Sequence, residues 1–227
     1  MYYGTGYDIL IIGITLLITL GAQGYINSTY NRCKKISTNK RISGREVARK
    51  ILDENGLKKV KIEEVPGELS DHYDPRNKVV RLSSAIYNES TIASASVAAH
   101  ECGHAIQDKN GYFFLRLRNS IIPLVNFSST AGYIAIMVGL IFSLTKLIWI
   151  GIILEAVILA FQLITLPVEF NASRRGIKQL TELGLVGEGE KDNCKKMLTA
   201  AALTYVASVA TAILQILRLV LIARRND

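Results

Sequence analysis

The sequence predicts a mostly α-helical membrane protein, with about four transmembrane helices and a small cytoplasmic α+β unit. Hydrophobic residues make up 49% of the 227 residues, the mean hydropathy is +0.25, and the apolar residues lie in four long runs. Only 20% of the residues are charged, yet the formal net charge is +8, because Lys and Arg cluster between the runs. This combination excludes a disordered chain, a disulfide scaffold and an ordinary soluble domain.

Each apolar run is close to the length of about 20 residues that crosses a bilayer as a helix. The runs cover residues 9–26, 121–144, 147–168 and 198–222. Asp8 precedes the first run, and Arg32, Lys34 and Lys35 follow it. A signal peptide carries its positive charges before the apolar stretch, so this order favours an uncleaved anchor with its N-terminus outside.

The positive charges predict the orientation of the segments between the runs. Residues 27–119 hold 17 of the 27 Lys and Arg residues, and residues 169–197 hold six more, so both segments should face the cytoplasm. The expected divisions are a membrane anchor (1–30), a cytoplasmic unit (31–119), a transmembrane hairpin (120–168), a second cytoplasmic segment (169–197) and a C-terminal membrane helix (198–227). Arg224 and Arg225 would then lie outside. Either the last run does not cross fully, or these two charges are tolerated.

The first cytoplasmic segment predicts two helices and a small sheet. Ser43 and Glu46 form a capping box that begins the first helix, and Gly56 ends it. Alternating residues predict a strand at 60–62, and a hairpin of residues 69–73 and 78–83 follows around a turn at 74–77. A helix rich in small residues should begin at Ser90 and end near Gln107.

Residues 100–104 read His-Glu-Cys-Gly-His, an H-E-x-x-H pattern on this expected helix. Residues i and i+4 share a helix face, so His100 and His104 can bind one zinc ion. Glu101 lies beside that face, where a carboxylate can take a proton from water at the metal and pass it to a leaving amine. The pattern therefore predicts a zinc hydrolase site with Glu101 as the general base.

A catalytic zinc site normally has three protein ligands and one open position. His72, on the expected hairpin, and Glu169, at the end of the third run, are the candidates for the third ligand. Two crossings after His104 return the chain to the same side of the membrane, which favours Glu169. Tyr73, His72 and Arg174 are candidate donors to the oxyanion of the reaction. Hairpin packing, a turn hydrogen bond and a surface charge are their respective structural alternatives.

Three stretches together resemble a known family. They are Leu-Ser-Asp-His-Tyr-Asp-Pro (69–75), Val-Ala-Ala-His-Glu-Cys-Gly-His-Ala-Ile-Gln (97–107) and Leu-Pro-Val-Glu-Phe-Asn-Ala-Ser-Arg-Arg (166–175). The chain is similar to the YugP-like membrane zinc metallopeptidases of bacteria, and distantly to HtpX-type and CAAX-prenyl zinc endopeptidases. The resemblance implies a zincin-like cytoplasmic unit, with His100, His104 and Glu169 as zinc ligands and Glu101 as the base.

The sequence departs from that family at two positions. Ser173 stands where the wider group carries an Asp that orients a ligand histidine, and Asn171 stands where nearer relatives carry an Asp. Loss of such a supporting carboxylate typically lowers metal affinity or activity 10–100-fold. The resemblance therefore leaves the catalytic efficiency open, but not the type of chemistry.

The sequence thus predicts a multi-pass protein of the cell membrane, a Zn²⁺-dependent endopeptidase that hydrolyses proteins at the cytoplasmic face. Its expected partners are protein or peptide substrates and the lipid bilayer, and no nucleic acid, because basic loops beside membrane spans account for the positive charge. The three scattered cysteines suggest a reducing compartment. The alternative is a non-catalytic membrane scaffold with a structural zinc site, which would close all four metal positions with protein ligands.

Overall fold

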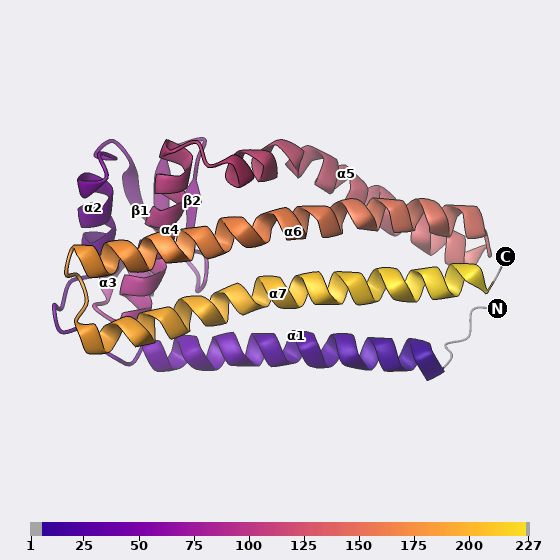
Figure 1. Ribbon diagram of the computed structural model, residues 1–227, viewed down its shortest axis with the longest axis horizontal. Coiled ribbons are helices and arrows are strands. Elements are labelled where there is room, and N and C mark those ends of the chain that lie inside the picture. The colour runs from indigo at the N-terminus through magenta and orange to yellow at the C-terminus, as the bar shows by residue number, and fades with distance from the viewer. Residues whose placement is uncertain (1–5, 226–227) are drawn as a thin grey trace. The chain divides into compact units, whose positions relative to one another are not determined.

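A computed structural model describes residues 6–225 of the chain. These residues form seven helices and three strands (Figure 1). The helices are α1 (Gly6–Cys33), α2 (Gly44–Glu54), α3 (Ser84–Asn88), α4 (Ile92–Lys109), α5 (Phe113–Ile141), α6 (Thr145–Glu182) and α7 (Glu188–Arg224), and the strands are β1 (Lys61–Val65), β2 (His72–Asp74) and β3 (Val79–Ser83).

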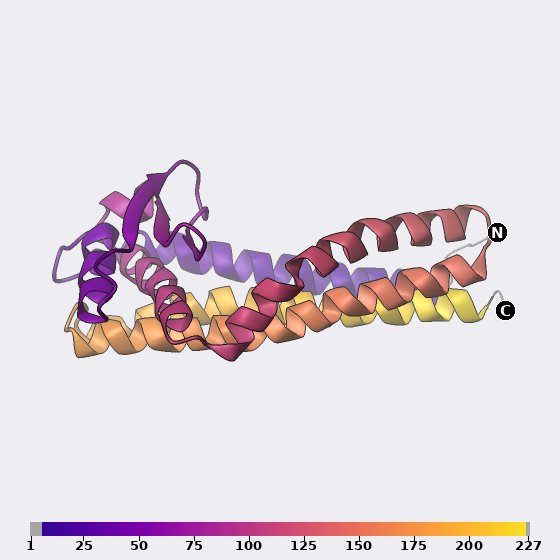
Figure 2. The ribbon, with the colours of Figure 1, turned by 90° about the horizontal axis from the view of Figure 1, so that it is seen from above.

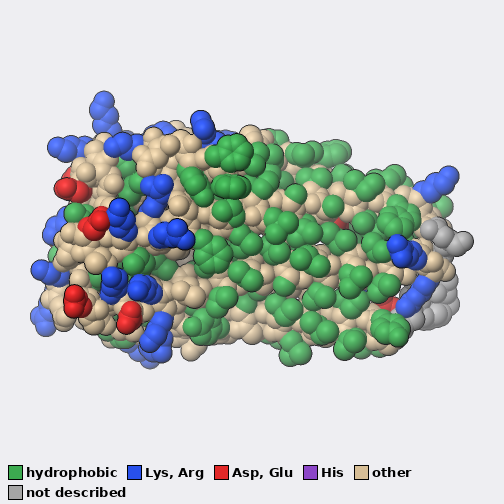
Figure 3. All heavy atoms as spheres, in the orientation of Figure 1, with side chains coloured by type: hydrophobic (Ala, Val, Ile, Leu, Met, Phe, Trp, Pro, Cys, Tyr) green, Lys and Arg blue, Asp and Glu red, His purple; other side chains and the backbone are tan. Residues whose placement is uncertain are grey.

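The chain divides into two compact units, which we describe separately. The helical unit comprises Met1–Gln23, Leu117–Leu166 and Leu203–Asp227, and the α/β unit comprises Gly24–Arg116 and Pro167–Ala202. Four helices, α1, α5, α6 and α7, have the length and composition needed to cross a membrane. Hydrophobic side chains dominate the exposed face that these helices present in Figure 3. These features confirm the predicted mostly α-helical membrane protein with a small α+β unit.

A charge cluster joins α1 to the end of α7 within the helical unit. Asp8 is only 4% exposed, and its carboxylate lies 3.5 Å from Arg225 Nη1 and 4.0 Å from Arg218 Nε. A buried carboxylate is stable only when a positive charge or hydrogen bonds compensate it. The charge-based topology places Arg225 outside, where a positive charge is unexpected. In the structure Asp8 of α1 is a negative partner for this charge.

The predicted capping box begins α2. The Glu46 N–H donates to Ser43 Oγ at 3.3 Å, and the Ser43 N–H donates to Glu46 Oε2 at 2.7 Å. The helix buries an apolar stripe of Val47, Ala48, Ile51 and Leu52. It ends at Glu54, and Gly56, with a φ of +66°, provides the left-handed conformation that turns the chain away.

The small sheet has the strand order β1-β3-β2. β1 pairs parallel to β3, with Lys61 opposite Val79, and β2 pairs antiparallel to β3, with Tyr73 opposite Val80. The predicted hairpin is thus confirmed as β2 and β3. The Asp74 side chain holds its turn by accepting hydrogen bonds from the N–H groups of the two residues that follow Pro75. β2 is an edge strand of this sheet and lies against α4.

The motif helix α4 begins at Ile92, two residues later than the sequence predicted. Thr91 is its N-cap, because Thr91 Oγ1 accepts the N–H of Ser94 at 3.1 Å. The Ser90 carbonyl instead accepts the N–H of Thr38 at 2.9 Å, which keeps Ser90 in an extended segment. The short helix α3, between β3 and α4, was not predicted.

Two membrane helices continue well beyond their apolar runs. α6 extends from the end of the third run to Glu182, and α7 already begins at Glu188. Gly184, with a φ of +58°, lies in the short turn between them. Within the α/β unit, α4 lies between the sheet and this continuation of α6 (Figure 2). The second cytoplasmic segment of the prediction is therefore mostly helix, and it packs directly on the motif helix.

Candidate metal centre

The two motif histidines project from one face of α4. His100 and His104 are one helical turn apart, and their ring centroids lie 4.7 Å from each other at an interplanar angle of 86°. Both side chains are largely buried, with exposed fractions of 15% and 12%. The i, i+4 spacing thus brings the two rings together as the sequence analysis expected.

Two glycines allow α4 and α6 to approach with their backbones almost in contact. A Cβ atom on Gly103 would lie 2.4 Å from the Ala172 carbonyl oxygen, and one on Gly176 would lie 2.8 Å from the Ala99 carbonyl oxygen. Neither distance leaves room for a methyl group. This close crossing brings Glu169, one turn before Ala172, to the histidine face of α4.

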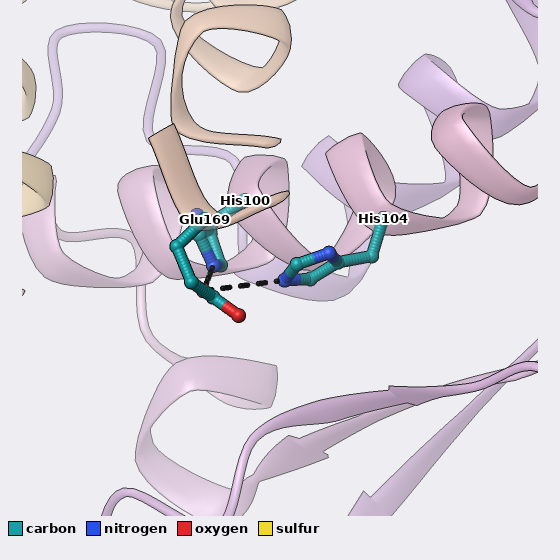
Figure 4. A group of neighbouring side chains, drawn as sticks. All are labelled: His100, His104 and Glu169. Atoms are coloured by element: carbon teal, nitrogen blue, oxygen red, sulfur yellow. Dashed lines mark ion pairs between the residues drawn. The ribbon is translucent and has the colours of Figure 1, made fainter. Parts of the chain in front are cut away.

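The Glu169 carboxylate reaches both imidazoles. Glu169 Oε2 lies 3.3 Å from His100 Nε2 and 3.6 Å from His104 Nε2 (Figure 4). Zinc binds imidazole nitrogen and carboxylate oxygen at about 2.0–2.2 Å, so two ligand atoms at neighbouring corners of a tetrahedral site lie roughly 3.3–3.6 Å apart. The two measured distances match that separation. The donor set of two nitrogens and one oxygen therefore fits a zinc ion in type and spacing.

Among residues 6–225, the metal-ligand cluster contains these three members and no fourth His, Cys, Asp or Glu. Cys102 is fully buried, and its thiol faces the Ala48 carbonyl oxygen at 3.6 Å, away from the cluster. His72 is exposed. Its Nδ1 lies 2.8 Å from the Ser70 carbonyl oxygen, and its Nε2 lies 3.3 Å from Arg81. The structure thus brings Glu169 to the two histidines and leaves His72 outside.

Each histidine also has a polar neighbour at its other ring nitrogen. Ser173 Oγ lies 3.0 Å from His100 Nδ1, and Gln107 Oε1 lies 3.0 Å from His104 Nδ1. Ser173 thus lies where the family resemblance led us to expect an orienting Asp. Gln107 was not predicted as a supporting residue, although its position three residues after His104, on the same helix face, was a usable signal.

Glu101 is buried next to the cluster. Its carboxylate lies near the Tyr73 backbone of β2. Burial is the main reason that the pKa of Glu101 is raised to about 7. The His100 ring and the Tyr73 backbone lower this pKa, whereas the nearby Glu169 and Asp71 carboxylates raise it. Asp71 is held by Ser83, whose N–H and hydroxyl both donate to it. The sheet therefore positions the carboxylate that the motif supplies.

Glu169 comes directly after the third apolar run, which ends at residue 168. Burial raises its pKa, but interactions with the adjacent His100 and His104 rings outweigh burial and hold the pKa well below its usual range. The carboxylate is therefore in the charged form that a metal ligand requires.

Two candidate oxyanion donors have other contacts. The Tyr73 hydroxyl donates to Asp108 Oδ2 at 2.7 Å, which ties β2 to the end of α4. Arg174 is exposed on α6 and lines a groove of about 270 Å³ toward α7, together with Phe170, Ile177, Leu198 and Lys195. In this structure, therefore, the Tyr73 hydroxyl is engaged with Asp108, and Arg174 lines a groove that it shares with Ser173, the neighbour of His100.

The chain was compared with known proteins. Residues 8–224 match the family model described as "Putative neutral zinc metallopeptidase". The chain is 42% identical over 205 residues to the "Putative membrane protease YugP" of Bacillus subtilis (strain 168), which covers 90% of this chain and 91% of that relative. No solved structure matches the chain. Together these matches show that the chain belongs to the neutral zinc metallopeptidase family and is a YugP-like membrane protein.

Proposed function

We propose that the chain is a zinc-dependent endopeptidase that hydrolyses peptide bonds of proteins at the cytoplasmic face of the cell membrane. The observation that carries this proposal is the convergence of His100, His104 and Glu169, whose ligand atoms all lie within 4.8 Å of one another, with Glu101 adjacent to His100 on the same helix. Two imidazoles, one carboxylate and a neighbouring buried carboxylate are the groups that zinc-assisted hydrolysis needs.

In this proposal His100, His104 and Glu169 hold the zinc ion. Zinc, when bound, supplies Lewis-acid polarisation of the peptide carbonyl and activation of water. Glu101 accepts the proton of the attacking water and delivers it to the leaving amine, because it lies beside the ligands without being one of them. The Glu101 carboxylate lies near the Tyr73 backbone at the sheet edge. β2, as an edge strand, offers a backbone along which an extended peptide can pair.

The positive charges support the cytoplasmic orientation. The α/β unit contains nearly all of the two segments that carry 17 and six of the 27 Lys and Arg residues. Arg218 and Arg225, at the C-terminal end of α7, pair with Asp8, so their positive charges are partly neutralised. With the site at the cytoplasmic face and β2 available for pairing, we expect unfolded or extended segments of membrane and cytosolic proteins as substrates.

A structural zinc site in a non-catalytic scaffold is the alternative. That function requires a fourth protein ligand. In the described range the cluster has three ligands, and His72, the residue that could have closed the site, is occupied by Ser70 and Arg81. This composition supports the enzyme over the scaffold.

The test uses the full-length protein in lipid nanodiscs, with zinc content and cleavage of casein measured on the same samples. Glu101→Gln should keep about one zinc per chain and lose cleavage by at least ~100-fold, because general base catalysis typically contributes 10²–10⁴-fold. Glu54→Gln makes the same chemical change at an exposed position on α2 and should cleave like the wild type. Near wild-type cleavage by Glu101→Gln would overturn the proposed role of Glu101.

A further inference from the structure

A chain of hydrogen bonds runs from α6 to the second motif histidine. It starts at Arg175, whose Nε donates to Asn171 Oδ1 at 2.7 Å. An arginine side chain has only donors and stays charged in proteins. The atom of Asn171 that faces Arg175 must therefore be the oxygen, which fixes the orientation of this amide.

The next member of the chain is Gln107, a residue of α4 with no exposed surface. Its Nε2 donates to Asn171 Oδ1 at 3.0 Å and to the Val168 carbonyl oxygen at 2.7 Å. Both partners are acceptors, so both amide hydrogens of Gln107 are used toward α6. The orientation of the Gln107 amide is therefore fixed as well, and its oxygen must point the other way, toward His104.

Gln107 Oε1 lies 3.0 Å from His104 Nδ1. An amide oxygen can only accept, so His104 must carry its hydrogen on Nδ1. In neutral imidazole the other nitrogen then has the lone pair. That nitrogen, Nε2, is the one that lies 3.6 Å from Glu169 Oε2. Arg175, through two amides, and the Val168 carbonyl together thus determine which nitrogen of His104 can bind a metal.

We infer that Arg175, Asn171 and Gln107 are positioning residues that fix the tautomer and the ring orientation of His104 through a relay of two neutral amides that starts at the arginine. This inference rests on the proposed zinc site for its purpose, but the tautomer is a property of the metal-free chain. The relay replaces the carboxylate that commonly orients a metal-binding histidine. It also explains how the site can be supported with Asn at position 171, because an acceptor oxygen is all that Arg175 and Gln107 require there.

Two nearly isosteric substitutions separate this role from simple packing. Gln107→Glu keeps an acceptor for His104 and loses both donors to α6, whereas Gln107→Met loses the acceptor and the donors. If Gln107 only holds α4 to α6, the two variants should be equally impaired. If the relay fixes the tautomer, only Gln107→Met should release His104.

The tautomer can be read by ¹⁵N NMR of histidine-labelled, zinc-free protein at mildly alkaline pH, and the chain has only three histidines to assign. We expect the Nδ1–H form of His104 in the wild type and in Gln107→Glu, and a mixture of tautomers in Gln107→Met. Zinc affinity, from competition with a chelator, should fall about 10–100-fold in Gln107→Met and less in Gln107→Glu. The Nδ1–H form in Gln107→Met, or equal zinc affinities of the two variants, would overturn the inference.

A second pair tests the far end of the relay, in case both Gln107 variants fail to fold. Arg175→Met removes the donor that orients Asn171, whereas Arg175→Lys keeps a donor. We expect Arg175→Met to weaken zinc binding and broaden the tautomer distribution, and Arg175→Lys to restore both. Equal behaviour of Arg175→Met and wild type would contradict the relay. A wild type that holds the Nδ1–H form but binds no zinc would instead count against the proposed function alone.

Discussion

Adding one methyl group at Gly103 should open the metal centre by separating α4 from α6. The Cβ atom of Gly103→Ala would lie 2.4 Å from the Ala172 carbonyl oxygen, whereas ordinary contact begins at 3.4 Å, so the backbones must part by about 1 Å. Glu169 lies one turn from Ala172 and would move with it. Metal–ligand distances tolerate only about ±0.2 Å. We therefore expect zinc affinity to fall at least ~10-fold and the free energy of unfolding to fall by about 1–3 kcal/mol, as is typical of overpacking.

The assay is chelator competition for zinc, combined with thermal unfolding of the metal-free protein in detergent. Gly189→Ala is the matched control, because a Cβ atom there meets no other atom within 4 Å and Gly189 lies in helix α7 of the same unit. The control should match the wild type in both measurements. Gly103→Ala with wild-type zinc affinity and unchanged thermal stability would refute the view that backbone contact between the two helices sets the ligand geometry.

Three further predictions concern ligand choice, the charge cluster and orientation. Glu169→Ala should strip zinc from the purified protein while His72→Ala leaves the metal content unchanged; the reverse pattern in metal analysis would reassign the third ligand. Asp8→Asn should lower the free energy of unfolding in detergent by about 1–3 kcal/mol. This loss is smaller than that for a fully buried ion pair, because the arginine partners of Asp8 are partly exposed. Unchanged stability would show that the cluster contributes nothing. The native cysteines are buried, so single cysteines introduced at the exposed Lys58 and Lys146 can report orientation. An impermeant thiol reagent applied to intact cells should label Lys146→Cys and not Lys58→Cys, and labelling of Lys58→Cys would contradict the cytoplasmic orientation.

The features that the sequence predicted well are those governed by local spacing. The i, i+4 interval places His100 and His104 on one helix face whatever surrounds them, and the capping box of Ser43 and Glu46 needs only four residues to form. The turn at Asp74 is likewise made by its own next neighbours. Glu169 was reached by topology, because two membrane crossings must return the chain to the side of the motif.

The features that the sequence could not predict depend on how distant segments pack. The helix α4 begins after Thr91 rather than at Ser90 because the Ser90 carbonyl pairs with Thr38, more than 50 residues earlier. The support of His104 by Gln107 could be suspected from spacing, but its anchoring by Asn171 and Arg175 depends on the crossing of α4 and α6.

The same crossing changes the meaning of the neutral residues at positions 171 and 173. From the sequence, Asn171 and Ser173 appeared as losses of a supporting carboxylate. In the structure, Ser173 lies within hydrogen-bonding distance of His100, and Asn171 accepts from both Arg175 and Gln107. A buried polar group is stabilising when all of its hydrogen-bonding capacity is met, whether or not it is charged. The departure from the family pattern is therefore compatible with a well-supported site.

X-ray absorption at the zinc edge tests the central claim most directly, because it reports the ligand atoms themselves. We predict about one zinc per chain with only nitrogen and oxygen neighbours at about 2.0–2.2 Å, including the scattering pattern of two imidazoles. A sulfur neighbour at about 2.3 Å, or a single imidazole, would contradict a centre built from His100, His104 and Glu169.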